Sequence, residues 1–296
     1  MTADSTDAEA IGIVLRGAYP PTLSNMDSPP ASLYVRGRFP APDGQRYLCV
    51  VGSRRWTRYG KDAAHRIISG LRGYPISIVS GLAVGIDSIA HEAALEAGLH
   101  CVAFPGSSLE WDEIYPRENV GLAREIVRAG GALLSQWGQG YPTGKWSFPA
   151  RNILMAGLSD AVMVVEAGRR SGSLMTAQHA EKQGRDVLAV PGPIEAANSY
   201  GPHMLIRRGA GLAASADDVL EALGFPVVRG KRPRAIDTSG MDPLSAAIIA
   251  AALREEATVS MLIERSGARP SAVSEKLSLL ELKGLIIIEN GVVSLA

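Results

Sequence analysis

From Tyr47 onward, short hydrophobic runs alternate with longer segments in which apolar residues recur at helical spacing. The runs predict buried strands at 47–52, 76–80, 100–104, 132–136, 161–166 and 186–190. The longer segments predict helices at 60–71, 86–97, 117–129, 149–157, 173–183 and 216–223. Strands that are apolar throughout and alternate with helices are typical of a parallel sheet covered on both faces. We therefore predict an α/β fold with a doubly wound parallel sheet, spanning residues 46–224.

The flanking segments lack this alternation. Residues 1–45 are rich in proline, serine and glycine, and we expect an irregular lead-in that packs on the main domain. Residues 225–240 contain two prolines and four basic residues, which predicts a flexible basic linker. Residues 241–296 predict three helices, at 242–256, 259–266 and 270–283, and then a hairpin around Asn290-Gly291. This order predicts a small C-terminal winged-helix domain.

Composition narrows the possible functions. The formal net charge is zero and the pI is about 7.0, so any site for a polyanion has to be a local patch. Cys49 and Cys101 lie within apolar runs and predict buried thiols, without metal-ligand spacing. The chain starts without a signal-peptide pattern and has no apolar run long enough to span a membrane. We expect a cytoplasmic protein that uses no metal or cofactor.

Small and basic residues follow strand after strand of the predicted sheet. Carboxyl ends of parallel strands meet at one edge, where glycine-rich turns and helix N-termini bind phosphates. The loop 168–173 between a strand and a helix is the strongest case, and the alternative is that its glycines and serines only make the turn. The residues expected at this phosphate-binding edge are Gly52, Ser53, Arg54, Arg169, Ser171, Gly172 and Ser173.

The loop after the fourth predicted strand, 138–148, combines Lys145 with the rings of Tyr141, Trp146 and Phe148. Positive charge interleaved with aromatic rings is typical of proteins that bind unstacked bases and their phosphates. The alternative is that Trp146 and Phe148 pack into the core, and we expect at least one of these aromatic residues to do so.

Several enzymatic motifs are absent, including a P-loop, a dinucleotide-binding G-x-G-x-x-G and a G-x-S-x-G elbow. Asp87 and His91 lie one helical turn apart and could form an acid–base pair. The favoured alternative is structural, with Asp87 at a helix N-terminus and His91 making hydrogen bonds. Glu166 follows a strand and is either a general acid or base, or a carboxylate that positions nearby arginines.

Longer motifs resemble those of the DNA-processing protein A (DprA/Smf) family. The matching pieces run from YPPTL at Tyr19 to LIRRGA at Ala210, and include VVGSR, SGLAVGIDSIAH, FPARN and VEAGRRSGSLMTA. The combination of GxxxGIDxxAH with EAxxxSGSLxTA is highly specific. The resemblance implies an extended Rossmann-like domain that binds single-stranded DNA with little base preference. It also implies a homodimer that loads the RecA recombinase, protects incoming DNA during natural transformation and is not an enzyme.

The same resemblance implies which residues contact DNA. Arg54, Lys145 and Phe148 match the pocket positions, and Arg151, Asn152 and the loop 171–173 line the same edge. The chain departs from the family pattern in having Gln136 after the fourth strand, Ile153-Leu154-Met155 after the FPARN motif, and His203-Met204 in the late motif. The common N-terminal helical module is absent or reduced to a stub.

Two other functions compete with this one. A nucleotide phosphoribohydrolase of the lysine-decarboxylase-like group would carry PGGxGTxxE where this chain has VEAGRRSGSLMTA. A transcription regulator would use the winged helix, but the candidate recognition helix balances Glu275 and Glu281 against Lys276 and Lys283. Recognition helices usually present a positive face, so an accessory role is favoured for this domain.

Overall fold

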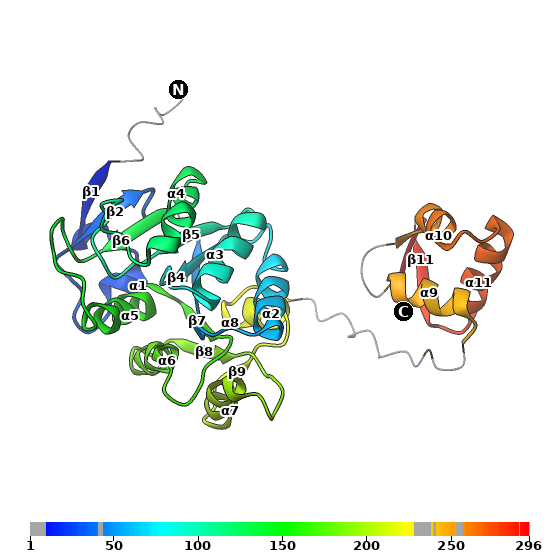
Figure 1. The fold of residues 1–296 in the computed structure, drawn as a ribbon. Coiled ribbons are helices and arrows are strands. Elements are labelled where there is room, and N and C mark those ends of the chain that lie inside the picture. Colours follow the sequence, from blue (N-terminus) through cyan, green and yellow to red (C-terminus); the bar gives the residue numbers. More distant parts are fainter. Residues whose placement is uncertain are drawn as a thin grey trace. The chain divides into compact units, whose positions relative to one another are not determined.

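The computed structural model describes residues 10–40, 44–227, 238, 241–252, 257–289 and 291–295. The chain divides into two compact units, Met1–Val227 and Val228–Ala296 (Figure 1). The expected linker, 225–240, lies mostly outside the described residues. Within the described residues, no helix is both long and apolar enough to cross a membrane.

The first unit is built on a nine-stranded sheet in the order β1-β2-β6-β5-β4-β3-β7-β8-β9. Strands β3 to β9 are all parallel, and the six expected strands are found within two residues of their predicted ends. The strands are β1 (Ile11–Leu15), β2 (Ser32–Gly37), β3 (Arg46–Val51), β4 (Ile76–Ser80), β5 (His100–Ala103), β6 (Ala132–Ser135), β7 (Ala161–Val164), β8 (Asp186–Ala189) and β9 (Gly211–Leu212).

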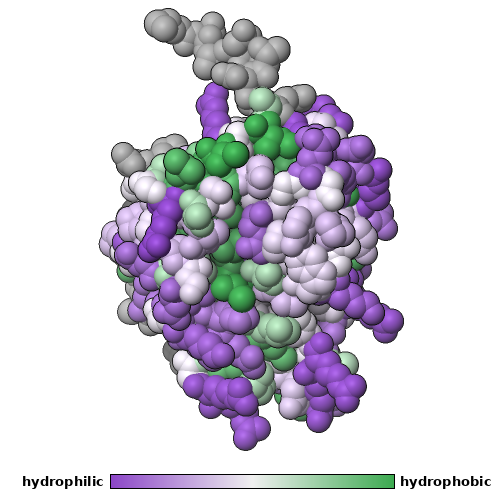
Figure 2. Space-filling view, turned by 90° about the vertical axis from the view of Figure 1, so that its left-hand side faces the viewer, coloured by the Kyte–Doolittle hydropathy of each residue, from purple (hydrophilic) through white to green (hydrophobic). Residues whose placement is uncertain are grey.

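The prediction of an irregular lead-in is wrong for the described residues before β3. Strand β2 pairs antiparallel with β6, and β1 pairs antiparallel with β2, so the sheet is mixed rather than purely parallel. Leu33 and Val35 of β2 are buried in the core, but the proline- and serine-rich flanks conceal this short alternation in the sequence. Strand β1 is an edge strand with Ile13 and Leu15 exposed, and hydrophobic side chains gather beside this start of the described chain (Figure 2).

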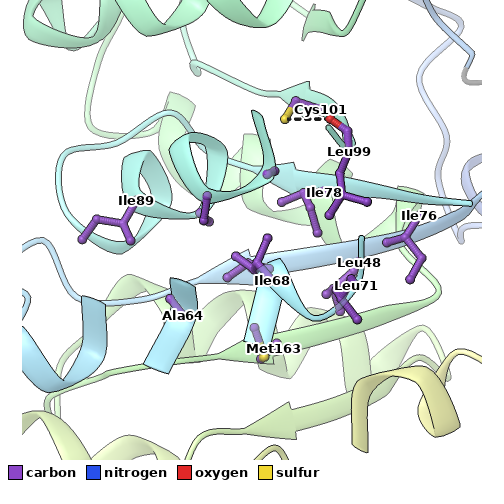
Figure 3. Packing of buried hydrophobic residues seen from close by; sticks show 14 of the residues in the cluster. Leu48, Ala64, Ile68, Leu71, Ile76, Ile78, Ile89, Leu99, Cys101 and Met163 are labelled. Carbon is purple, nitrogen blue, oxygen red and sulfur yellow. Dashed lines mark hydrogen bonds between the residues drawn. The ribbon is translucent and has the colours of Figure 1, made fainter. Parts of the chain in front are cut away.

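Helices cover both faces of the sheet. Buried side chains of adjacent strand residues, such as Leu48 and Cys49, point to opposite faces and enter two separate cores. Figure 3 shows the core formed with α2 and α3, where Ile68 and Ile89 pack against Leu48 and Ile78. Helices α2, α3, α4 and α8 contact one another on this face, and α1, α5, α6 and α7 supply residues to the other core.

The helices of the first unit are α1 (Pro21–Ser24), α2 (Arg58–Ser69), α3 (Ile86–Glu96), α4 (Val120–Arg128), α5 (Ser147–Leu158), α6 (Gly172–Lys182), α7 (Tyr200–Arg207) and α8 (Ala216–Ala222). Short 3₁₀ turns lie at Arg16–Ala18, Arg117–Asn119 and Ala197–Ser199. Helices α1 and α7 were not expected from the sequence.

The strand order reverses between β3 and β7, which are neighbours at the centre of the sheet. From β3, the chain proceeds through β4 and β5 toward one edge, and after β7 it proceeds through β8 toward the other. Loops that follow two such strands turn away from each other and leave a crevice at the carboxyl edge. The loops after β3 and β7 are those that carry Arg54 and Ser171.

The described residues of the second unit form three helices and a three-stranded antiparallel sheet in the order β10-β12-β11. Its elements are α9 (Pro243–Ala252), β10 (Ala257–Thr258), α10 (Val259–Ser266), α11 (Pro270–Leu282), β11 (Ile286–Glu289) and β12 (Val292–Leu295). Ile248, Leu262 and Leu277 belong to a core of its own. Strands β11 and β12 form the expected hairpin, and Asn290 lies outside the described residues.

Candidate nucleic-acid interface

A cavity of about 520 Å³ lies at the point where the strand order reverses. Its walls come from the loops after β3 and β7 and from the first turns of α3, α5 and α6. The lining residues are Val51, Gly52, Ser53, Arg54, Arg55, Ala83, Asp87, Lys145, Phe148, Pro149, Arg151, Asn152, Gly168, Arg170, Ser171, Gly172, Ser173, Met175, Thr176 and Asn198.

The cavity brings together almost all of the residues expected at the DNA-binding edge. The exception is Arg169, whose guanidinium carbon lies 4.4 Å from the centre of the Tyr200 ring instead of lining the cavity. Its neighbour Arg170 lines the cavity. The structure thus places the sequence-predicted residues in one site, while their contact with DNA stays a prediction.

Phe148 lies close to two guanidinium groups. The guanidinium carbon of Arg54 is 5.6 Å from the ring centre and that of Arg151 is 5.9 Å away, within the range of a cation–π interaction. The ring of Tyr115 lies 5.6 Å from that of Phe148, at an angle of 47°. Phe148 is half-buried and Trp146 is 48% exposed, so the expectation that an aromatic side chain of this loop enters the core is wrong for both.

Arg151 forms the floor of the cavity rather than its rim. Only 6% of the residue is exposed, and its Nη1 donates hydrogen bonds to the backbone oxygens of Gly81 and Phe104. These oxygens belong to the ends of two neighbouring strands, so the guanidinium joins α5 to the loops after β4 and β5. Burial lowers the pKa of Arg151, while the charge of Asp87 favours its protonated form.

Positive charge dominates the lining of the cavity. Five basic residues, Arg54, Arg55, Lys145, Arg151 and Arg170, face one acidic residue, Asp87. Burial raises the pKa of Asp87, against the opposing effects of Arg151 and of backbone hydrogen bonds from Gly52, Ala83 and Gly81. Except for Arg151, the basic side chains are exposed, so their charges are available to a ligand.

The N-terminus of α6 adds backbone donors to the same cavity. Ser171 caps the helix, and its Oγ lies 2.6 Å from the Oγ of Ser173. The first N–H groups of a helix have no partner within the helix and carry a partial positive charge. Together with the arginines, this end of α6 makes the cavity suitable for a phosphate group.

The acid–base alternatives have structural explanations. Asp87 lies in the first turn of α3 and accepts a 3.2 Å hydrogen bond from Gly81 N–H. His91 is fully buried, and desolvation lowers its pKa to about 4, so the ring is neutral at pH 7. Neither ring nitrogen has a hydrogen-bond partner of ordinary geometry among the described residues, so the hydrogen bonds expected of His91 are not found. Glu166 is buried and accepts hydrogen bonds from Thr57 N–H at 3.0 Å and from Thr57 Oγ1 at 2.5 Å. Glu166 thus anchors the start of α2 instead of positioning an arginine.

Sequence reasoning missed several lining residues. Thr176 lies one turn beyond Gly172 and Ser173 on α6, and helical spacing would have placed it on the same face. Its Oγ1 is buried without a hydrogen-bond partner among the described residues. Asn198 comes from the loop after β8 and donates a 2.6 Å hydrogen bond to the backbone oxygen of Arg55. No local pattern in the sequence indicates this long-range contact.

Comparison with known proteins relates the chain and its fold to one family. The model of the family described as DNA recombination-mediator protein A matches residues 11–224. Protein Smf of Escherichia coli K12 is 38% identical over 90% of this chain and 72% of its own length. DNA processing protein DprA of Streptococcus pneumoniae is 40% identical over 72% of this chain and 73% of its own length.

Two solved structures share this architecture. The X-ray structure of DprA from Streptococcus pneumoniae aligns with a TM-score of 0.66 and 37% identity, covering 75% of this chain and 77% of that one. The structure of DNA processing protein A from Helicobacter pylori aligns with a TM-score of 0.64 and 29% identity, covering 73% and 96%. The Helicobacter pylori protein is described as having a unique single-stranded DNA binding mode.

Proposed function

Since the chain belongs to the DNA recombination-mediator protein A family, we propose that its cavity between β3 and β7 binds single-stranded DNA. The observation that carries this proposal is the Phe148 ring, whose centre lies 5.6 Å from the guanidinium carbon of Arg54 and 5.9 Å from that of Arg151, in a cavity whose charged residues are mostly basic. A half-buried ring offers a stacking surface to a base, and the flanking cations hold the adjoining phosphates. Four exposed cationic side chains and the N-terminus of α6 supply the phosphate contacts.

The shape of the site favours a single strand over a duplex. Proteins that read a duplex insert a helix or ribbon into a groove, whereas this site is concave and has its aromatic ring inside. In a duplex, each base is stacked on its neighbours and its face is inaccessible to Phe148. A single strand can turn an unstacked base into the cavity. Stacking is tolerant of sequence, so we expect weak base preference.

We propose that binding, rather than catalysis, is the function of this cavity, and that the protein loads the RecA recombinase onto the bound strand. In this proposal the protein acts as a homodimer and protects incoming DNA during natural transformation. The support is the family membership together with a site suited to holding a strand. The test is RecA filament assembly on single strands, which the full chain should accelerate and an Arg54→Ala variant should not.

We propose that residues 241–296 form a winged-helix domain with an accessory role. Three helices followed by the β11–β12 hairpin support this assignment, as does a separate hydrophobic core. All lining residues of the cavity belong to the first unit. A chain that ends at Val227 should therefore fold and bind single strands within about tenfold of the full chain. Loss of binding by a folded truncated chain would assign part of the primary site to the second unit.

The direct test of the proposed function compares single-stranded and duplex oligonucleotides at several salt concentrations. For single strands, the logarithm of the binding constant should fall with the logarithm of salt concentration by about 0.7 for each phosphate neutralised. Three to six basic contacts of the kind found here give a slope of about −2 to −4. Equal or tighter binding to the duplex would contradict the proposal.

A further inference from the structure

We propose that Tyr141 and Trp146 form a second base-stacking platform beside the cavity, so that a bound single strand continues over the loop between β6 and α5. This inference rests on the proposed function and specifies the path of the strand outside the cavity. It is carried by three aromatic rings that pack on one another outside the two hydrophobic cores of the first unit.

The three rings belong to Trp137, Tyr141 and Trp146. The Trp137 and Tyr141 rings are stacked, with centres 4.7 Å apart and an angle of 10° between their planes. Trp146 stands nearly perpendicular to both, at 5.0 Å and 86° from Trp137 and at 5.5 Å and 79° from Tyr141. One face of Tyr141 is therefore covered by Trp137. The other face extends the stack outward, with Trp146 beside it as a wall.

The platform is exposed although it consists of large aromatic side chains. Tyr141 is 45% exposed and Trp146 is 48% exposed, and neither belongs to a hydrophobic core of the first unit. Aromatic residues make up only 5% of the chain, so three mutually packed rings on one short loop are a concentrated feature. A base placed on the open face of Tyr141 would continue the existing stack and contact Trp146 with its edge.

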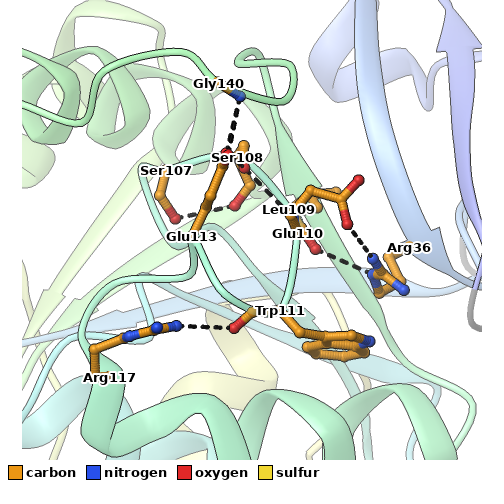
Figure 4. A network of polar contacts seen from close by, with 9 residues as sticks. All are labelled: Arg36, Ser107, Ser108, Leu109, Glu110, Trp111, Glu113, Arg117 and Gly140. Atoms are coloured by element: carbon orange, nitrogen blue, oxygen red, sulfur yellow. Dashed lines mark hydrogen bonds and ion pairs between the residues drawn. The ribbon is translucent and has the colours of Figure 1, made fainter.

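The loop that carries the rings is held in place by polar contacts. Glu113 accepts hydrogen bonds from Gly140 N–H at 3.1 and 3.0 Å, and its carboxylate is itself bonded by the Ser108 hydroxyl (Figure 4). At the other end of the loop, the Ser147 hydroxyl donates a 2.7 Å hydrogen bond to the Gly144 backbone oxygen. A platform fixed in this way binds a base with less loss of conformational entropy than a mobile loop does.

The platform is continuous with the cavity. Lys145 and Phe148 both line the cavity, and Trp146 lies between them in the chain. Consecutive Cα atoms are 3.8 Å apart, so the Cα atoms of Trp146 and Phe148 are separated by at most about 7.6 Å. Residues this close together can contact neighbouring nucleotides of one strand. Lys145 is therefore placed to hold the phosphate that joins a base in the cavity to a base on the platform.

The experiment measures the affinity of the full chain for oligothymidylates of increasing length, in the wild type and in Tyr141→Leu and Trp146→Leu variants. Leucine keeps an apolar side chain in the cluster but removes the π face. For the longer strands, each variant should bind about 5- to 100-fold more weakly than the wild type. For the shortest strand that binds, which fills only the cavity, all three proteins should have the same affinity.

Tyr74→Leu is the matched control. Tyr74 is 38% exposed and also packs against one ring, that of Phe225 at 5.4 Å, but it precedes β4 and so lies at the opposite edge of the sheet. This variant should bind strands of every length like the wild type. Melting temperatures of all variants verify that each is folded, and Trp146→Leu decides the outcome if Tyr141→Leu does not fold.

If both platform variants bind strands of every length with wild-type affinity, the proposed platform is wrong. An equal loss for short and long strands would overturn it as well, since the rings would then act only by supporting Lys145 or Phe148. The cavity is tested separately with Arg54→Ala. If this variant loses binding while the platform variants bind normally, the platform is wrong and the proposed function stands. If the wild type binds no single strand, both are wrong.

Discussion

The guanidinium carbon of Arg54 lies 5.6 Å from the centre of the Phe148 ring, although the two residues follow different strands and different loops of the sheet. Arg54 lies in the loop after β3, the strand at which the chain changes direction, and Phe148 lies in the first turn of α5, after β6. The doubly wound topology brings both to the carboxyl edge. This contact lies at the centre of the proposed site. In the proposal, the Arg54 charge holds a phosphate and the Phe148 ring stacks on a base.

Removing a rim cation should weaken binding to single strands of every sequence. We expect Arg54→Ala and Lys145→Ala each to flatten the salt slope by about 0.7, because each variant leaves one phosphate without its cation. Titrations at several salt concentrations measure this. Arg58→Ala is the control, because Arg58 is also an exposed cation but pairs with Asp62 and does not line the cavity. Normal affinity in a stable Arg54→Ala protein would contradict the proposed pocket.

Loss of the Phe148 ring should reduce affinity without changing the salt slope. Phe148→Ala removes a stacking surface but no charge, so we expect a cost of about 1–3 kcal/mol in binding free energy. Because Phe148 is only half-buried, the melting temperature of the variant protein should fall only slightly. A large fall in melting temperature with unchanged affinity of the folded protein would instead assign Phe148 to the packing of the loops.

Arg151 should behave differently from the rim arginines. Arg151→Ala removes the donor to the oxygens of Gly81 and Phe104 and the positive charge beside buried Asp87. We expect the free energy of unfolding to fall by about 3–5 kcal/mol, as when one member of a buried charged pair is removed. Chemical denaturation measures this. Arg170→Ala is the control, since Arg170 is exposed at the rim and its loss should change stability by less than about 0.5 kcal/mol.

Burial of His91 should make the stability of the first unit depend on pH. Desolvation lowers the pKa of His91 to about 4 in the folded chain, below its ordinary value of 6.5. Between these values the unfolded chain binds more protons, so stability is complete above pH 6.5 and is lost as the pH falls toward 4. The full contribution is about 3 kcal/mol.

Other groups with shifted pKa values also make stability depend on pH, so the test compares two proteins at two pH values. The raised pKa of Asp87 acts with the opposite sign, while the lowered pKa values of His100 and His179 act with the same sign as His91. We therefore compare unfolding of the wild type and His91→Gln at pH 7.5 and pH 5. The wild type should lose more stability than the variant over this interval, and parallel losses would show that His91 does not contribute.

The sequence contains enough information to predict the parallel strands and most helices of the first unit. These strands are apolar throughout because both faces are covered, and that pattern is visible without knowledge of the fold. Membership of the recombination-mediator family was predicted from motifs and is confirmed by the match over residues 11–224. Strands β1 and β2 were missed because they are short and β2 joins the main sheet through β6, which is distant in the chain.

The candidate site was also predicted only in part. Glycines and arginines at strand ends indicated the cavity, because carboxyl ends of parallel strands share one edge. Spacing could not distinguish Arg169, which packs on Tyr200, from Arg170, which lines the cavity. The direction of a loop side chain depends on contacts from distant segments. The same limit applies to Arg151, whose burial depends on carbonyl oxygens of two other loops.

The pairing of β2 with β6 also limits when the first strands can join the sheet during synthesis of the chain. Strands β1 and β2 leave the ribosome before the other strands of the sheet, yet β2 has no partner on its second side until residues 132–135 have been made. Until then β1 and β2 form at most an isolated two-stranded ribbon, which is marginally stable in water. Strand β2 can therefore join the main sheet only after β6 has been made, and its apolar Leu33 and Val35 stay accessible to chaperones until then.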